Sequence, residues 1–88
     1  MPMIFKIIDA AAHQAATHSG QFLGAEIDLK DGYIHFSTAT QVAETAKRHF
    51  AGRSNLMLWA IDAGGLGTAL KWEASRGGEL FPHLYEPL

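Results

Sequence analysis

Two stretches of the chain carry most of the side chains that could take part in chemistry. The first, Trp72–Tyr85, places a carboxylate, a hydroxyl, a guanidinium, a glycine pair, an imidazole and a phenol within fourteen positions. The second, Asp31–Thr38, adds a second phenol, a second imidazole and two hydroxyls. Such groups orient polar ligands and transfer protons. The two stretches together predict a polar ligand pocket.

Alternation along both stretches predicts strands that gather these polar groups on one surface. Successive side chains of a strand point to opposite faces, so every second residue shares a face. The apolar residues expected to face the core are Ile34, Phe36, Leu70 and Trp72. The polar residues expected on the opposite face are His35, Ser37, Glu73, Ser75, His83 and Tyr85. Gly77 and Gly78 are expected to turn the chain between two of these strands.

Each polar residue also has a purely structural interpretation. A single histidine in a strand, such as His35, more often makes a structural hydrogen bond than takes part in catalysis. Thr38 begins a Thr-x-x-Gln sequence typical of a helix capping box, and Arg76 can be an exposed charge in a hairpin turn. His35, Glu73 and His83 would together suit zinc or iron, but we expect no metal. The coincidence of both stretches favours a ligand site over these separate interpretations.

The clearest of the remaining segments predict one strand and two helices. Residues 3–8 are rich in β-branched and aromatic residues, which is typical of a strand. Residues 10–19 are rich in alanine and are expected to form a helix that Asp9 caps and Gly20 ends. Apolar residues at a helical period predict a second helix over residues 39–51.

Three weaker patterns lead to further expectations. Residues 21–30 show no clear period and are expected to form a loop with a short extended piece at Phe22–Leu23. The continuous apolar run at residues 56–61 predicts a central strand covered on both faces. Pro82 lacks an N–H, so the strand over residues 80–85 is expected at a sheet edge or at a bulge.

Composition limits the classes of protein to which the chain can belong. Eighty-eight residues form one domain, residues 1–88, because two independent cores would not fit. The absence of cysteine excludes disulfides, thiolate metal sites and a thiol nucleophile. A net charge of −2 with scattered basic residues argues against nucleic acid as a partner. No leader pattern and no long apolar segment occurs, so no membrane association and a cytoplasmic location are expected. The expected fold is α+β: a single compact domain with a strongly bent sheet of four to six strands and two helices.

Several segments resemble a family of uncharacterised bacterial proteins. These segments are Ile4–Ile7, Asp31–Thr38, Thr45–Gly52, Ala60–Asp62, Leu66–Gly67 and Trp72–Tyr85. They cover nearly the whole chain and resemble the domain of unknown function 952 family. That family looks like a small, divergent relative of the ADP-ribosyltransferase fold, most similar to the catalytic domain of RNA 2′-phosphotransferases. The resemblance therefore implies an ADP-ribosyltransferase-like fold.

The resemblance also implies a ligand and a set of site residues. Ile34–Ser37 is similar to a His-x-His-Leu-Ser-like strand of those phosphotransferases, and Ser75–Gly78 is similar in order to their Ser-x-Asn-Gly-like turn. The implied ligand is nucleotide-like, NAD or ADP-ribose. The implied catalytic residues are Glu73, His35 and His83. The implied ligand-contacting residues are His35, Ser37, Thr38, Ser75, Arg76, Gly77 and Tyr85.

The chain also departs from the phosphotransferases. Its first strand offers Lys6 but no Arg-His pair for a phosphate, and no counterpart of their basic RNA-gripping domain is expected. Both departures argue against an RNA substrate.

Two functional classes follow, with a third interpretation of the polar surface. The first is an enzyme that breaks the nicotinamide–ribose bond, with Glu73 against the oxocarbenium-like ribose and His35 orienting its hydroxyls. The second is a non-catalytic module that binds a metabolite or a partner protein. In the third, the polar surface is a contact of a weak homodimer, which exposed Trp59 and Phe81 would fit. A monomer or a weak homodimer is expected.

Overall fold

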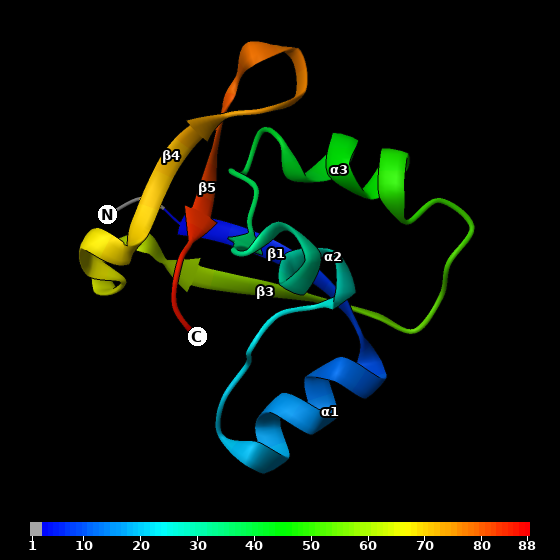
Figure 1. The fold of residues 1–88 in the computed structure, drawn as a ribbon. Helices are drawn as coiled ribbons and strands as arrows, with labels where there is room; N and C mark the ends of the chain where they lie inside the picture. Colours follow the sequence, from blue (N-terminus) through cyan, green and yellow to red (C-terminus); the bar gives the residue numbers. More distant parts are fainter. Residues whose placement is uncertain (1–2) are drawn as a thin grey trace.

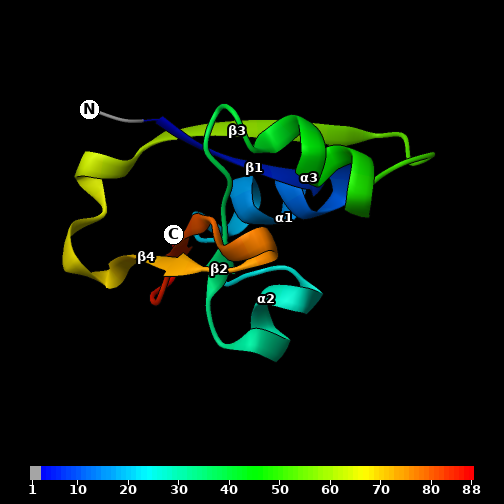
Figure 2. The same ribbon diagram turned by 90° about the horizontal axis from the view of Figure 1, so that it is seen from above.

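The chain builds two small antiparallel sheets that face each other across one core (Figures 1 and 2). The computed structural model describes residues 3–88, apart from the side chain of Arg76. Over this range it contains β1 (Met3–Asp9), α1 (Ala10–Ser19), α2 (Glu26–Asp31), β2 (Ile34–His35), α3 (Val42–His49), β3 (Leu56–Asp62), β4 (Leu70–Ala74) and β5 (Leu80–Leu84). Three short 3₁₀ turns lie at Ala63–Gly65, Gly67–Ala69 and Arg76–Gly78. The prediction of one compact α+β domain is confirmed. The prediction of a single sheet of four to six strands with two helices is wrong, because the described residues form a two-stranded and a three-stranded sheet with three helices.

The strands divide between the two sheets. One sheet pairs β1 with β3, and the other has the order β2-β5-β4. An isolated bridge joins the two sheets. Phe5 of β1 and Ser37, just beyond β2, exchange backbone hydrogen bonds of 2.7 and 2.8 Å. This bridge holds the end of the β2 segment against β1, so that residues 33–37 reach both sheets.

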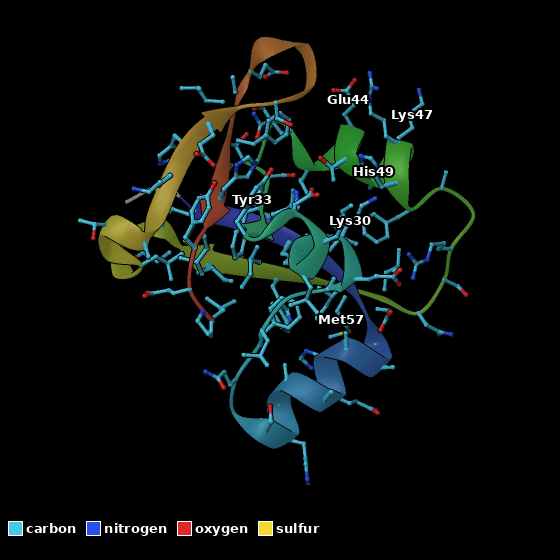
Figure 3. The ribbon with its side chains drawn as sticks, viewed as in Figure 1. Lys30, Tyr33, Glu44, Lys47, His49 and Met57 are labelled. Carbon is cyan, nitrogen blue, oxygen red and sulfur yellow. The ribbon has the colours of Figure 1, made fainter. Side chains whose placement is uncertain are left out.

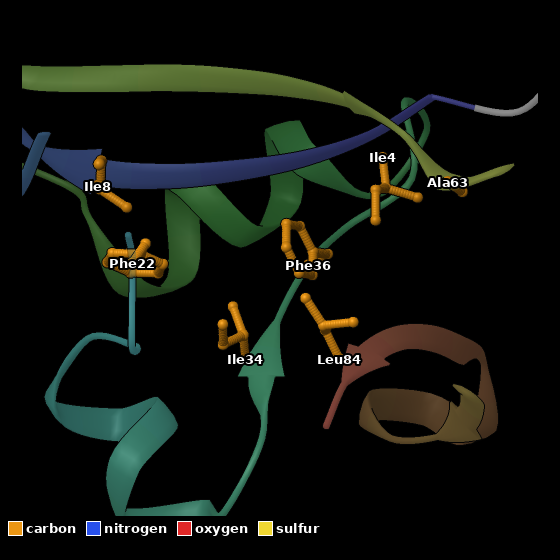
Figure 4. Close-up of a cluster of buried hydrophobic side chains, with 7 residues drawn as sticks. All are labelled: Ile4, Ile8, Phe22, Ile34, Phe36, Ala63 and Leu84. Atoms are coloured by element: carbon orange, nitrogen blue, oxygen red, sulfur yellow. The ribbon is translucent and has the colours of Figure 1, made fainter. Parts of the chain in front are cut away.

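The hydrophobic core lies between the two sheets (Figure 4). Its buried members are Ile4, Ile8, Phe22, Ile34, Phe36, Ala63 and Leu84. Full burial of one such large apolar side chain contributes about 1.5–3 kcal/mol. Ile34 and Phe36 face the core, as their alternation predicts. Lys6 occupies the position between Ile4 and Ile8 on the same buried face of β1 and is 6% exposed.

Helix α1 follows the local signals in the sequence. The Asp9 side chain accepts a hydrogen bond of 2.7 Å from the Ala12 N–H, and Gly20 ends the helix with φ of +80°. A left-handed backbone of this kind favours glycine. The helix packs Ala12 and Ala16 against the core next to β1 and β3. Both predicted bounds of this helix are confirmed.

The prediction of a loop over residues 21–30 is wrong in its second half, because α2 begins at Glu26. The helix has only six residues, too few to show a helical period. Its first turn is stabilised by Asp28, whose Oδ2 accepts a hydrogen bond of 2.8 Å from the Ala25 N–H. The Phe22 backbone exchanges two hydrogen bonds with that of Leu88, of 2.9 and 3.0 Å.

Two strands lie in positions other than those expected. Within the described residues β3 pairs with β1 alone, and Leu58 is 58% exposed, so β3 is an edge strand and not a central one. Strand β5 is central in its sheet despite Pro82. The Pro82 carbonyl accepts a hydrogen bond from the Phe36 N–H, just beyond the end of β2. In an antiparallel pair the N–H and carbonyl of one residue face the same partner, so the N–H that proline lacks would also have pointed to Phe36. Pro82 therefore interrupts the ladder only where β2 has already ended.

One predicted core residue lies at the surface. Trp72 is 42% exposed because β4 is the edge strand of its sheet, whereas Leu70 on the same face is partly buried against the core.

Candidate functional site

Five side chains from three neighbouring strand segments form one cluster on the three-stranded sheet. They are Tyr33, His35, Glu73, His83 and Tyr85, and we call them the tyrosine–histidine face. His35 and Lys71 both lie opposite His83 in the strand register. Alternation thus brings together His35, Glu73, His83 and Tyr85 of the predicted polar face, and Tyr33 joins them, whereas the Ser37 hydroxyl lies against Thr45. His83 itself is buried, at 3% exposure, because the neighbouring rings and Glu73 cover it.

Glu73 is the acidic centre of this face. Its Oε1 lies 2.8 Å from His83 Nδ1 and accepts a hydrogen bond of 2.6 Å from the Tyr85 hydroxyl. The bonds from Tyr85 and His83 lower the pKa of Glu73, so the group is a carboxylate at neutral pH. The same bond raises the pKa of Tyr85 to about 12. The carboxylate is held by two donors while its side chain stays 39% exposed.

The Tyr33 ring lies among the other rings of the face. Its centroid is 4.1 Å from that of His83, 4.5 Å from that of His35 and 5.2 Å from that of Tyr85. In Figure 3 Tyr33 lies in the middle of the molecule, between α2 and β5. Burial, and then the negative charges of Asp31 and Glu73, raise the pKa of Tyr33. The face therefore combines aromatic surface with negative charge.

A second polar cluster lies behind this face and centres on Asp28. Lys6 Nζ is 3.0 Å from Asp28 Oδ2, and His35 Nδ1 is 2.6 Å from Asp28 Oδ1. The Lys6 ammonium also donates a 2.9 Å hydrogen bond to the His35 carbonyl. We call these residues the Lys6–Asp28–His35 network. The network joins β1, α2 and β2 and fixes the position of the His35 ring.

The charges of the network stabilise one another against burial. Burial raises the pKa of Asp28, but the hydrogen bond from His35, the charge of Lys6 and the Ala25 amide outweigh it and lower the pKa to about 2. Burial lowers the pKa of Lys6, against the opposing effect of Asp28. A charge buried to this degree is tolerated only with a partner. Asp28, at 1% exposure, therefore depends on Lys6 and His35.

Gly24 leaves room for Asp28 to approach. A side-chain carbon placed at Gly24 would lie 2.9 Å from Asp28 Cβ, and the glycine has φ of +129°. Any other residue at this position would strain the backbone and displace the carboxylate.

The other predicted site residues lie away from the five-residue face. Ser37 is buried, and its hydroxyl is 2.9 Å from the Thr45 hydroxyl of α3. The Thr38 N–H donates to Gln41 Oε1 at 3.0 Å, one half of the predicted capping box. Ser75 and Gly77 belong to the β4–β5 turn, where the Ser75 carbonyl accepts from the Gly78 N–H. Arg76 belongs to the same turn, and its side chain lies outside the described part of the structure.

Two shallow depressions flank the core. One, of about 210 Å³, is lined by Tyr33 and Tyr85 of the tyrosine–histidine face together with Leu23, Asp28, Leu29, Gly32, Ile34, Leu84, Glu86 and Pro87. The other, of about 290 Å³, lies beside α1 and includes His13, Phe22 and Trp59. There the Trp59 indole N–H donates to His13 Nδ1 at 2.9 Å. Among residues 3–88 as described, no three His, Asp or Glu side chains are grouped so as to hold a metal ion.

Sequence reasoning missed Lys6, Asp28 and Asp31 as members of the site. One signal could have revealed the network, because Lys6 alternates with Ile4 and Ile8 and must share their buried face. A buried lysine requires a carboxylate partner. Nothing in the local sequence indicates that Asp28, 22 positions away, is that partner.

The comparisons with known proteins point to one family. Residues 7–88 match the model of a family described as protein of unknown function (DUF952). A crystal structure of protein CC0527 from Caulobacter crescentus is 52% identical, with a TM-score of 0.96 over 98% of this chain and 75% of that one. A solution NMR structure of the same protein is also 52% identical, with a TM-score of 0.89 over 100% of this chain and 76% of that one. No curated protein matches the chain. No helix in the described residues is long and apolar enough to cross a bilayer.

Proposed function

The chain belongs to the DUF952 family, and we propose that its tyrosine–histidine face binds a nucleotide-like ligand, NAD or ADP-ribose. The observation that carries this proposal is the Glu73 carboxylate, which two donors hold while its side chain stays partly open to solvent. A fixed carboxylate beside aromatic rings suits a ribose with an attached ring, because the oxygens bind hydroxyls and the rings stack on the base.

The dimensions of the adjoining depression limit how such a ligand can lie. Its volume of about 210 Å³ is below the roughly 300–1,000 Å³ of a typical ligand pocket. We therefore place one ring or one ribose beside Tyr33 and Tyr85, with the rest of the dinucleotide along the exposed surface. Ser75, Arg76 and Gly77, at the hairpin turn, are the proposed contacts for that outer part.

The proposed reaction is transfer of an ADP-ribosyl group from NAD. Glu73 would stabilise the positive charge that develops on the ribose as the bond to nicotinamide breaks. His83 and Tyr85 would hold the carboxylate in place. The ADP-ribosyltransferase-like fold implied by the sequence resemblance supports this chemistry by analogy.

A non-catalytic binding module is the second candidate. The observation that favours it is the exposed apolar rim of the depression, where Leu23 is 61% and Leu29 66% exposed. Apolar side chains of this kind suit a metabolite or a partner protein held without chemistry.

Two measurements on the same variants separate these candidates. Calorimetry gives the affinity for NAD, and chromatography gives the rate of nicotinamide release. For an enzyme, Glu73→Gln abolishes release and leaves affinity largely intact, while Glu79→Gln at the neighbouring turn changes neither. Binding by the wild type without nicotinamide release supports the module. An absence of binding contradicts the proposal.

A further inference from the structure

We propose that His35 Nε2 is a proton-accepting atom of this site, that Asp28 is the positioning residue that fixes it, and that Asp31 covers it. The geometry that carries this inference involves the protein alone. The chemical use of the atom rests on the function proposed above.

The contacts of Asp28 decide which nitrogen of His35 keeps its proton. Oδ1 receives the His35 N–H at 3.1 Å and Lys6 Nζ at 3.3 Å, in addition to His35 Nδ1 at 2.6 Å. Oδ2 receives the Ala25 N–H at 2.8 Å and Lys6 Nζ at 3.0 Å. Backbone N–H and ammonium groups only donate, so Asp28 acts as an ionised acceptor on both oxygens. His35 Nδ1 must therefore carry a proton.

The other ring nitrogen faces a different carboxylate. His35 Nε2 lies 3.0 Å from Asp31 Oδ2, and the two side chains are 30% and 36% exposed. With Nε2 protonated, the ring donates to both carboxylates. Because a carboxylate oxygen only accepts, Nε2 donates to Asp31 while Asp31 covers it, and Nε2 can accept a proton only when Asp31 moves aside. Since Nδ1 is committed to Asp28, the proton that the ring exchanges with solvent or a ligand is the one on Nε2.

The surroundings of the ring are charged on several sides. The titratable groups close to it are Asp28 and Asp31 of α2, Lys6 of β1, His83 of β5, Tyr33 beside the ring, and Glu73 of β4 beyond His83 and Tyr33. His35 and His83 lie with ring centroids 5.5 Å apart, so His35 adjoins the carboxylate centre of the face. An acceptor group held there would meet Nε2 once Asp31 moves aside.

The class of acceptor follows from this role. In the transfer proposed above, the oxygen of a water or alcohol forms a bond to the ribosyl C1′ as the C1′–nitrogen bond to nicotinamide breaks. The bonding electron pair goes to the nicotinamide nitrogen, and the hydroxyl proton goes to His35 Nε2. A carboxylate-oriented imidazole is an effective general base of this kind.

The first test uses the wild-type protein without ligand. Long-range ¹H–¹⁵N NMR spectra of the histidines, recorded across a pH series, identify the protonated nitrogen of each neutral ring. The expected result is a neutral His35 with its proton on Nδ1. A neutral His35 with its proton on Nε2 overturns the proposal.

The second test measures how accessible the atom is. Diethyl pyrocarbonate modifies deprotonated imidazole nitrogens, and mass spectrometry gives the rate at each histidine. Asp31→Asn is expected to raise the His35 rate about two- to fivefold, because it removes the partly exposed carboxylate that holds the protonated form of the ring at Nε2. Glu26→Gln on the same helix is the matched control, and exposed His18 is the internal reference. An unchanged His35 rate in Asp31→Asn overturns the role of Asp31. Neither test involves NAD, so a failure of the proposed function leaves both results interpretable.

Discussion

Lys6 and Asp28 form a buried ion pair, with Lys6 Nζ 3.0 Å from Asp28 Oδ2 and side-chain exposures of 6% and 1%. Pairs of this kind gain little stability over apolar residues, but the loss of one partner is costly. This pair ties β1 to α2, and Asp28 in turn holds the His35 ring. The position of His35 in the candidate site thus depends on an ion pair in the interior of the protein.

The network predicts a specific loss of stability in acid. The pKa of Asp28 falls from 3.8 to about 2 on folding, so its contribution is complete above the unfolded value and disappears as the pH falls through the folded one. The difference corresponds to about 2 kcal/mol of unfolding free energy. Urea denaturation between about pH 5 and 2 should show the advantage of wild type over Asp28→Asn shrinking by about that amount. Asp31→Asn is the matched control for removing one carboxylate, and a constant advantage would contradict the assignment.

A double-mutant cycle tests the pair itself. Lys6→Met and Asp28→Asn should each cost about 3–5 kcal/mol, because each leaves a buried charge without its ion-pair partner across the core. The double variant should cost less than the sum, with a coupling of about 1–3 kcal/mol. The exposed pair Glu44–Arg48, 3.4 Å apart on α3, is the control and should couple by only about 0.3–0.5 kcal/mol. Additive costs at Lys6 and Asp28 would show that the pair does not interact.

The bond between Tyr85 and Glu73 predicts an altered phenol titration. The pKa of Tyr85 is raised from 10.0 to about 12, first because its hydroxyl donates a hydrogen bond to Glu73 and then because burial and the Glu73 charge disfavour the phenolate. In a Tyr33→Phe background, absorbance at alkaline pH should report Tyr85 alone. Glu73→Gln should bring its midpoint down towards the ordinary value, with circular dichroism confirming the fold at each pH. Equal midpoints with and without Glu73→Gln would exclude the bond.

The contact between α1 and β3 predicts a local effect on one tryptophan. His13→Leu removes the acceptor of the Trp59 indole N–H and should cost about 1 kcal/mol of stability. The Trp59 indole resonance should shift in the NMR spectrum while that of Trp72, on the other sheet, stays in place. His18→Leu on the same helix is the control. A shift of both indole resonances would indicate a wider rearrangement.

Local patterns account for the parts of the fold that the sequence predicts. Asp9, the alanine run and Gly20 define α1 without help from distant residues. Alternation likewise predicts that His35, Glu73, His83 and Tyr85 share a face, because the period of a strand is fixed by its geometry. Alternation cannot predict which strands are neighbours in a sheet. The central position of β5 despite Pro82 and the edge position of β3 both depend on that pairing.

The Lys6–Asp28–His35 network could not be predicted from the sequence for a similar reason. Asp28 lies in a six-residue helix without a visible period, and its partners come from β1 and β2. The predicted ligand contacts Ser37 and Thr38 show the converse. In the structure the Ser37 hydroxyl lies 2.9 Å from the Thr45 hydroxyl of α3, and the Thr38 hydroxyl lies 3.2 Å from the Thr40 hydroxyl; their contact with a ligand stays a prediction.

The dimer interpretation loses its structural basis, although the oligomeric state itself stays a prediction. Phe81 is 6% exposed and Trp59 is partly buried against α1, so neither offers the exposed apolar surface that the interpretation requires.

An NMR titration of the backbone amides with NAD and with ADP-ribose shows directly whether the tyrosine–histidine face binds a nucleotide-like ligand. Binding at this face should shift only the amide resonances of residues 33–37 and 73–85, and Tyr33→Leu should reduce these shifts. The amides around His13 and Trp59, at the second depression, should not move and serve as an internal control. No shifts at millimolar ligand, or shifts centred on that second depression, would contradict binding at this face.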